Sequence, residues 1–333
     1  MYFSAGTEPG AFDKANEDWA AVSPYAAVVL DGVTVFDEAN SGCIHGTPWY
    51  VNQLGPRLLA AASAQDICLQ AALRDAISAV ADLHADTCDL DQVGAPSAAV
   101  AIVRIGEHSV EYLVLADVTI LLDSADGLCV LSDERVADTV NDLAGKESVG
   151  AEVMKRRERY RNREGGYWVA AADPSVADHA KTGQIPLKGF GHAALMSDGV
   201  TRLVSPFEQT SWHGLLAAVL NSGPASVIKH VRSIEAADAQ GERWPRFKVS
   251  DDATIAVISA LTDVDSRSAA HLNLGFLADS MPSSIVPSSA QAHNHTPGRQ
   301  RRDCRTAYCS SRGKISVARA ASFMIPEARR PNS

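Results

Sequence analysis

Several aspartates of this sequence stand where a short apolar run begins or ends. They are, in chain order, Asp18, Asp31, Asp117, Asp198 and Asp251. A β-strand holds its terminal side chain firmly, so carboxylates from several strand ends can meet at one edge of a sheet. Carboxylates gathered in one place repel each other, and they must either take up protons or hold a cation. Oxygen ligands of this kind favour Mg²⁺ or Mn²⁺ over Zn²⁺ or Cu²⁺.

Two of these aspartates, Asp31 and Asp198, are each followed by a glycine. Asp-Gly is also a common turn dipeptide, because both residues tolerate turn geometry. A third pair, Asp126-Gly127, lies between two apolar runs and predicts a plain hairpin turn. A single Asp-Gly pair therefore favours a turn over a metal ligand. Only the order and context of the pairs support a functional interpretation.

The elements that must position these residues can be predicted from apolar patterning. Runs that suit buried strands cover 26–32, 97–105, 110–117, 118–124, 192–199 and 253–261. Helical spacing covers 47–64, 66–85, 211–221 and 225–239, with a break or kink expected at Gly55-Pro56. Strands separated by only a few residues form antiparallel meanders. The pattern predicts an α+β domain built in layers.

The charge of the chain is unevenly distributed. The sequence has 333 residues with 30 Lys+Arg and 40 Asp+Glu, a net charge of −10. From residue 266 onward basic residues exceed acidic ones by seven, so residues 1–265 carry −17. An acidic body is unsuited to nucleic acid, whose phosphates require clustered Lys and Arg. No apolar run is long enough for a membrane span. We expect a soluble cytoplasmic protein, and nothing in the sequence specifies an oligomeric state.

The cysteines and the end of the chain carry weaker signals. The first four cysteines form no close CxxC pair, which disfavours both a zinc site and a disulfide framework. We expect residues 1–263 to form the folded domain and residues 264–333 to form a basic, disordered tail rich in Ser, Ala, Pro and Arg. The tail holds His293, His295, Cys304 and Cys309, whose irregular spacing favours an accidental grouping over a metal site.

The order of the motifs resembles the PPM, or type 2C, family of metal-dependent protein serine/threonine phosphatases, in a divergent bacterial form. The similarity spans roughly residues 1–261. It is carried by Asn16-Glu17-Asp18, Val29-Leu30-Asp31-Gly32, Pro96-Ser97-Ala98, Leu115-Ala116-Asp117, Leu131-Ser132-Asp133, Met196-Ser197-Asp198-Gly199 and Asp251-Asp252-Ala253-Thr254. The resemblance implies an α-β-β-α sandwich of two antiparallel sheets flanked by helix pairs.

The resemblance also implies roles for individual residues. Asp31 would bridge two Mn²⁺ or Mg²⁺ ions, and Gly32 would offer its backbone carbonyl. Asp198 and Asp251 would complete one ion, and Asp18 would reach the second. Asp117 corresponds to a ligand of a third ion. In such enzymes a water held between the two ions attacks the phosphorus of a phosphate monoester. Asp31 and Asp198 are therefore the expected catalytic residues.

The sequence departs from the family pattern at several positions. Val33, Thr34 and Val35 follow Gly32, where the family usually has a further pair of glycines. Asp13 stands where a phosphate-binding arginine is expected, with Lys14 beside it as an imperfect substitute. Arg202 stands where many members have another aspartate for the third ion. We expect Lys14 and Arg202 to be candidates for binding the substrate phosphate.

Two further segments contain residues capable of chemistry. His45, in the loop after the central Asp-Gly, could act as a general acid, although packing or capping of the next helix is the simpler interpretation. The segment 152–169 holds a basic cluster that could recruit phosphorylated substrate or simply form a solvated helix face ending at Gly165-Gly166. The cluster consists of Lys155, Arg156, Arg157, Arg159, Arg161 and Arg163.

Two functions remain open at this point. The retained aspartates favour a metal-dependent phosphatase that acts on phosphoserine or phosphothreonine in proteins. The lost glycines and arginine favour a catalytically weak or dead pseudophosphatase that serves as a regulatory binding module. We expect the enzyme, with a phosphorylated protein as its substrate partner.

Overall fold

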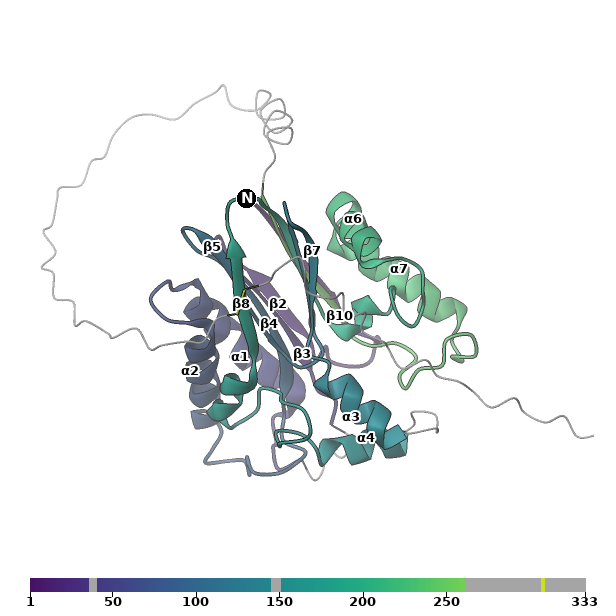
Figure 1. Cartoon of the computed structure of the whole chain (residues 1–333). Coiled ribbons are helices and arrows are strands. Elements are labelled where there is room, and N and C mark those ends of the chain that lie inside the picture. The colour runs from purple at the N-terminus through teal and green to yellow at the C-terminus, as the bar shows by residue number, and fades with distance from the viewer. Residues whose placement is uncertain (36–40, 145–150, 261–306, 309–333) are drawn as a thin grey trace, which may run out of the picture.

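Two β-sheets packed face to face form the centre of the protein, and a pair of helices covers the outer face of each sheet (Figure 1). The structure is a computed structural model, and it describes residues 1–35, 41–144, 151–260 and 307–308. The layers are thus helix, sheet, sheet, helix. This architecture confirms the predicted α-β-β-α sandwich.

The first sheet carries the central aspartate. Its strand order is β11-β8-β5-β4-β3-β2, and all neighbours are antiparallel except β11 and β8. The strands are β2 (Trp19–Val22), β3 (Ala26–Gly32), β4 (Ala98–Ile105), β5 (Ser109–Leu115), β8 (Lys181–Pro186) and β11 (Ala307–Tyr308). The bounds of β3 coincide with the predicted run 26–32.

The second sheet has the order β1-β10-β9-β6-β7 and is antiparallel throughout. Its strands are β1 (Tyr2–Glu8), β6 (Thr119–Ser124), β7 (Gly127–Leu131), β9 (Phe190–Met196) and β10 (Ala253–Ser259). Strands β6 and β7 form a hairpin in which Ser124 pairs with Gly127, whose φ is 106°. The expected turn at Asp126-Gly127 is therefore confirmed.

Alternation along the strands builds separate hydrophobic cores on the two faces of each sheet. In β3, Ala27 and Val29 pack between the sheets, whereas Val28 and Leu30 pack under helices. Both sets are fully buried. This explains why the strand reads as a continuous apolar run instead of alternating with polar residues.

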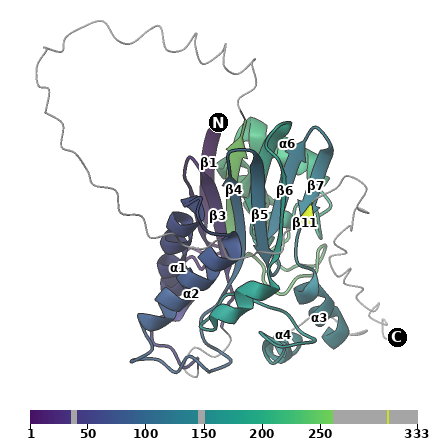
Figure 2. The same cartoon turned by 60° about the vertical axis from the view of Figure 1, so that its left-hand side comes forward.

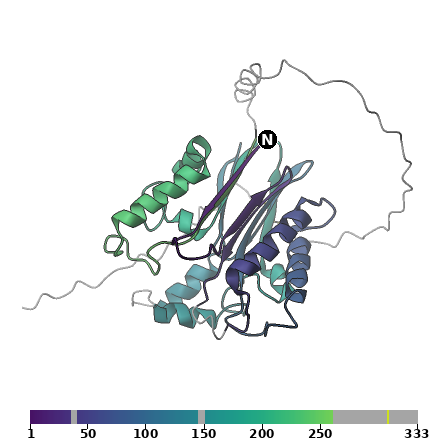
Figure 3. The ribbon, with the colours of Figure 1, turned by 180° about the vertical axis from the view of Figure 1, so that it is seen from behind.

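The helices lie in three groups. Helices α1 (Gly46–Ser63) and α2 (Leu69–Asp82) cover the first sheet, and α6 (Trp212–Ser222) and α7 (Pro224–Ala237) cover the second (Figure 3). Helices α3 (Arg135–Ala144) and α4 (Ala151–Glu158) lie together at one end of the sandwich (Figure 2). The short helix α5 (Asp198–Thr201) follows β9, and a 3₁₀ helix spans Pro174–His179.

Some expected boundaries are wrong. Helix α1 starts at Gly46 with His45 as its N-cap residue, and it continues through Gly55-Pro56 instead of breaking there. Gly55 has a packing reason, because a Cβ atom at this position would lie 2.3 Å from Cδ2 of Trp19. Helix α4 ends at Glu158 and not at Gly165, since the chain turns back and the N–H of Asn162 donates to the carbonyl of Tyr167 at 2.8 Å.

The expected tail of residues 264–333 lies outside the described residues, apart from Ala307–Tyr308, which form β11 beside β8. The segment 145–150 before α4 also lies outside them. None of the described helices combines the length and the hydrophobicity that crossing a lipid bilayer would require.

Candidate functional site

The Asp31-Gly32 pair is the end of a strand and not a turn. Both residues pair with β4, Asp31 opposite Ala99 and Gly32 opposite Ala98. A Cβ atom on Gly32 would lie 2.3 Å from the backbone oxygen of Glu17. Glycine is therefore required here because the neighbouring backbone comes so close. This close approach brings the segment that carries Asp18 next to the end of β3.

The second pair, Asp198-Gly199, stands at the start of α5, directly after β9. A Cβ atom on Gly199 would lie 2.0 Å from the backbone oxygen of Asp252, so this glycine also permits a close approach of backbone. The N–H of Asp198 donates to Oδ2 of Asp31 at 3.2 Å. One aspartate from each sheet is thus brought into contact.

Asp18 is buried, with 5% of its surface exposed, just before β2. Its Oδ2 atom is buried and has no hydrogen-bond partner among the described residues. Burial, together with the nearby Asp252 and Asp198 carboxylates, raises the pKa of Asp18 to about 8. A buried carboxylate oxygen without a partner is costly. It is therefore a natural place for a cation ligand.

A cavity of about 130 Å³ lies where these elements meet. Six of the residues that line it are site residues expected from the sequence, namely Asp31, Gly32, Asp117, Asp198, Asp251 and Arg202, whereas Asp18 is not among the lining residues. Burial and the neighbouring carboxylates of Asp18 and Asp198 raise the pKa of Asp31 well above its ordinary value. Burial also raises the pKa of Asp198 to about 7, with Asp251 as the next cause. The carboxylates therefore repel one another, as a shared cation site requires.

Asp117 enters the cavity from the end of β5, after Ala116, whose φ of 68° is unusual for a residue with a side chain. Burial raises the pKa of Asp117, while the guanidinium of Arg157 lowers it. The cavity therefore places one cation from the basic segment beside this carboxylate.

Two cations hold Asp251. The guanidinium of Arg202 donates to its Oδ2 at 3.0 Å, and Nζ of Lys248 donates to its Oδ1 at 2.6 Å. Arg202 also donates to Oε1 of the buried Glu235 at 3.0 Å. Although burial disfavours its charge, the neighbouring Asp251 raises the pKa of Lys248. Asp251 is consequently neutralised from within the protein, unlike Asp18 and Asp31.

The neighbouring Asp252 has a different task. Its two carboxylate oxygens accept from the backbone N–H groups of Gly10 at 2.7 Å and Glu17 at 2.6 Å. These bonds fasten the segment before β2 onto the start of β10. Asp252 therefore positions Asp18 indirectly.

Three residues predicted to bind substrate are found in different settings. Arg202 lines the cavity, but its guanidinium is shared between Asp251 and Glu235. Lys14 is exposed on the loop before β2, and the residues that line the cavity do not include it. His45 does not line the cavity either, since its ring stacks on Trp49 at 4.3 Å and its Nδ1 faces Cys43 and Cys88. His45 is therefore not in a position to act as a general acid at the cavity.

Residue spacing does not single out two of the cavity's cations. Lys248 lies in a stretch without periodicity, and only its spacing of three residues before Asp251 hinted at contact. Arg157 is one of six basic residues in its segment, and spacing alone does not distinguish it. Its Nε is buried and has no hydrogen-bond partner within the described ranges, while the guanidinium lies 5.7 Å from the ring centre of Tyr167.

The donor set fits a hard divalent cation. Carboxylates of raised pKa, a buried carboxylate oxygen without a partner and a nearby backbone carbonyl at Gly32 are ligands that Mn²⁺ and Mg²⁺ accept. Ligation by a cation would relieve the repulsion that raises the pKa of Asp31. The residues that would bind the cation are Asp18, Asp31, Gly32 and Asp198. Asp251 would join them once the ion had replaced its cationic partners.

Comparison with known proteins connects this arrangement to solved structures. No family model and no curated protein sequence matches the chain. A bacterial serine phosphatase matches 79% of this chain and 99% of its own length, with a TM-score of 0.50 and 13% identity. The serine/threonine phosphatase PstP/Ppp of Mycobacterium tuberculosis covers 78% of this chain and 99% of its own, with a TM-score of 0.48 and 15% identity.

A third structure is the catalytic domain of the phosphatase PstP in complex with 2 manganese ions. It covers 78% of this chain and 98% of its own, with a TM-score of 0.47 and 16% identity. The match to the bacterial serine phosphatase covers the layered domain almost completely. The chain therefore has the fold of the PPM-type serine/threonine phosphatases, as the order of its motifs predicts.

Proposed function

We propose that this chain is a metal-dependent phosphatase that hydrolyses phosphate monoesters on serine or threonine side chains of proteins. One observation carries the proposal: aspartates from the ends of both sheets gather around a single small cavity and raise one another's pKa. Such an arrangement costs stability unless it serves a cation. These aspartates belong to the motifs whose order resembles that of the phosphatase family.

The proposed metal ligands are Asp18, Asp31, Asp198 and Asp251 with the carbonyl of Gly32, and Asp117 is a candidate for a further ion. Two Mn²⁺ or Mg²⁺ ions bound there would supply Lewis-acid chemistry and lower the pKa of a bound water. The backbone N–H of Asp198 donates to Oδ2 of Asp31 and holds these two residues together. Arg202 and Lys248 form ion pairs with Asp251, and an ion that bound this carboxylate would have to replace them.

The substrate phosphate would bind beside Arg157. The cavity has about four times the ~30 Å³ that one water occupies in the liquid, which leaves room for a phosphate group and little more. A guanidinium with an unused donor can grip a phosphate through paired hydrogen bonds. The rest of a phosphorylated protein would stay outside the cavity. Arg202 remains a second candidate for this contact, if a phosphate can compete with Asp251.

A pseudophosphatase is the second candidate, and a specific observation favours it. Asp251 already has two cationic partners, Arg202 and Lys248, which would oppose its use as a metal ligand. A chain that binds one ion weakly and releases no phosphate would act as a regulatory binding module. We consider the enzyme better supported, because Asp18 and Asp31 have no such internal neutralisation.

The test is an assay of the full chain on an aryl phosphate and on a phosphothreonine peptide, with Mn²⁺, with EDTA and with Asp31→Asn. The enzyme predicts turnover that requires Mn²⁺ and disappears with EDTA or the substitution. Activity indifferent to both would exclude a metal-dependent phosphatase. Mn²⁺ binding by calorimetry without turnover would support the pseudophosphatase.

A further inference from the structure

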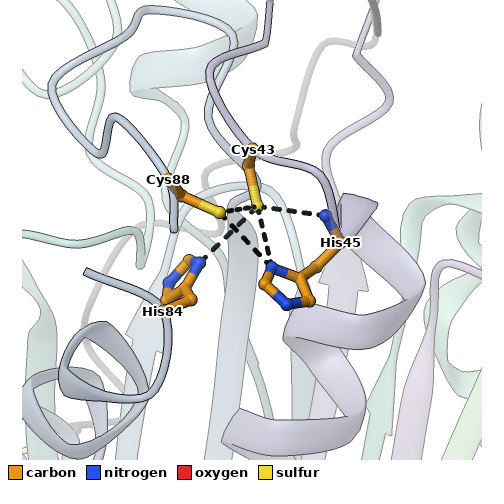
Figure 4. Close-up of side chains that lie close together, drawn as sticks. All are labelled: Cys43, His45, His84 and Cys88. Carbon is orange, nitrogen blue, oxygen red and sulfur yellow. Dashed lines mark hydrogen bonds between the residues drawn. The ribbon is translucent and has the colours of Figure 1, made fainter. Parts of the chain in front are cut away.

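Two cysteines and two histidines form a cluster (Figure 4), and none of them lines the carboxylate cavity. Cys43 and His45 lie just before α1, whereas His84 and Cys88 lie just after α2. One ligand atom from each residue lies within 4.8 Å of the other three. The two cysteines are free thiols, and their sulfurs are 3.4 Å apart, too far for a disulfide bond.

The distances in this cluster match those around a tetrahedral ion. Cys43 Sγ lies 3.7 Å from His45 Nδ1 and 3.5 Å from His84 Nδ1, and Cys88 Sγ lies 3.4 Å from His45 Nδ1. Zn–S bonds of ~2.3 Å and Zn–N bonds of ~2.0 Å place tetrahedral ligand atoms roughly 3.3 to 3.8 Å apart. The four atoms therefore surround a point at which one ion fits.

The backbone holds these four residues in place. The N–H of Asp89 donates to the carbonyl of Gly42 at 2.8 Å and joins the two loops. The N–H of His45 points at Cys43 Sγ at 3.4 Å, which suits a sulfur that carries negative charge. Trp49 packs against the rings of both histidines, with centroid distances of 4.3 and 4.8 Å. The loops thus present the ligands and exclude water on one side.

Packing alone explains the cluster poorly. A thiol is a weak donor and a weak acceptor, so two thiols and two imidazoles satisfy one another badly. Cys43 and His84 are nevertheless buried. Thiolate and imidazole ligands favour Zn²⁺, whereas the carboxylate cavity favours Mn²⁺ or Mg²⁺. Four protein ligands also leave no open position, which is typical of a structural and not a catalytic zinc site.

We propose that Cys43, His45, His84 and Cys88 bind one structural Zn²⁺ ion. The expectation of no zinc site considered only CxxC pairs, whereas the ligands here come from a Cys-x-His pair and a His-x₃-Cys pair. The ion joins the loop before α1 to the loop after α2. Because Oγ1 of Thr47, in the first turn of α1, donates to the carbonyl of Val33 at 3.2 Å, the ion also steadies the chain that follows Asp31-Gly32. The proposal does not depend on phosphatase activity.

The direct test uses the unaltered full chain, purified in reducing buffer without chelator and then dialysed. Elemental analysis is expected to find about one zinc per chain. After replacement of zinc by Co²⁺, the absorption spectrum is expected to show intense d–d bands of a tetrahedral ion and a thiolate-to-cobalt charge-transfer band. Release of the zinc is expected to lower the melting temperature, because binding energy at a structural site is folding energy. A chain that takes up no zinc would overturn the proposal.

Variants locate the ion. Cys43→Ser and His84→Gln are each expected to reduce the zinc content to below roughly a tenth per chain and to abolish the charge-transfer band or shift it. Cys68 and Cys129 are disulfide-bonded, which overturns the expectation of no disulfide framework and makes the other cysteines unsuitable as controls. The control His108→Gln removes an exposed histidine outside the cluster and is expected to keep both the zinc and the charge-transfer band. If a cluster variant fails to fold, the cobalt spectrum of the unaltered chain still decides whether two thiolates bind the ion.

Two other results would also overturn the proposal. Zinc that persists at full occupancy in Cys43→Ser would place the ion elsewhere, such as the carboxylate cavity. A Cys43–Cys88 disulfide found by mass spectrometry in the freshly purified chain would mean that the cluster is a redox pair. Phosphatase activity does not enter any of these readouts, so failure here is distinguishable from failure of the proposed function.

Discussion

The Cys/His cluster and the carboxylate cavity solve the problem of gathering metal ligands in opposite ways. In the Cys/His cluster, four groups that can be neutral lie within 4.8 Å of one another. In the cavity, each carboxylate carries a burial cost and raises the pKa of its neighbours. Neutral soft ligands approach one another at little electrostatic cost, whereas charged hard ligands need cations to offset their repulsion.

The difference has a structural consequence inside the cavity itself. Asp251 has two cationic partners, and their positive charges offset the negative charge of its carboxylate. Asp18 has no such partner among the described residues, and its pKa rises to about 8. Asp251 is therefore neutralised by its two cationic partners, whereas Asp18 requires a cation from outside the protein. The predictions below test this difference and the separation of the cavity from the Cys/His cluster.

The largest effect is expected for Asp198→Ala. Loss of a shared metal ligand is expected to reduce Mn²⁺-dependent kcat by about 10³-fold, since metal ions supply several kcal/mol of transition-state stabilisation. The control is Asp126→Asn, which changes the exposed Asp-Gly pair of the β6–β7 turn and is expected to leave kcat within about twofold. If Asp198→Ala also lost its zinc, the two sites would not be separate.

The next effect concerns stability without metal. The pKa of Asp18 is raised from 3.8 to about 8 in the folded chain, so unfolding is favoured progressively as the pH rises between these values. We therefore compare the unfolding free energy of Asp18→Asn with that of the unaltered chain in EDTA. The advantage of Asp18→Asn is expected to grow by on the order of 2 kcal/mol between pH 5 and pH 9. Urea unfolding at both pH values measures this difference.

The exposed Asp142→Asn serves as the control for the Asp18 experiment and is expected to show no such pH dependence. A difference between Asp18→Asn and the unaltered chain that stays constant from pH 5 to pH 9 would contradict the raised pKa. Added Mn²⁺ is expected to remove most of the disadvantage of the unaltered chain at pH 9, because the ion binds the ionised carboxylate.

A smaller effect is expected for Arg157→Ala. Removal of this cavity cation is expected to raise the KM for a phosphopeptide by about tenfold, while kcat changes less, since the lost contact acts on bound substrate. Arg156→Ala is the matched control, because Arg156 is the exposed neighbour on the same helix. Equal KM values for the two variants would show that the basic segment acts only through its overall charge.

The smallest effect is expected for Lys248→Gln. The substitution removes a competitor for Asp251, and the Kd for Mn²⁺ is expected to fall a few-fold. Lys229→Gln, on the exposed side of α7, makes the same change in net charge and controls for it. Titration calorimetry of both variants separates the two effects. An increase in Kd for Lys248→Gln would mean that Lys248 positions Asp251 as a ligand.

Much of the fold follows from local patterns in the sequence. Strand β3 was predicted at its observed bounds, because Ala26–Leu30 forms a continuous apolar run that must be buried on both faces. Strand and helix patterning predicts the layered α+β domain, and the resemblance of the motif order to a known family predicts the sandwich. Asp31, Asp198 and Asp251, which that resemblance assigns to one site, line the same cavity. Strand β1 was missed, since its burial is partial and its pattern weak.

The sequence by itself determined which residue types stand at the strand ends, whereas the tertiary structure decided what they do. Asp126-Gly127 and Asp31-Gly32 are the same dipeptide, but only the second brings its glycine within reach of another backbone. Cys43 and Cys88 meet across 45 positions because α1 and α2 pack side by side. Apolar periodicity is a local property that a sequence displays directly. Contacts between distant residues depend on how the layers pack, and no spacing rule encodes that.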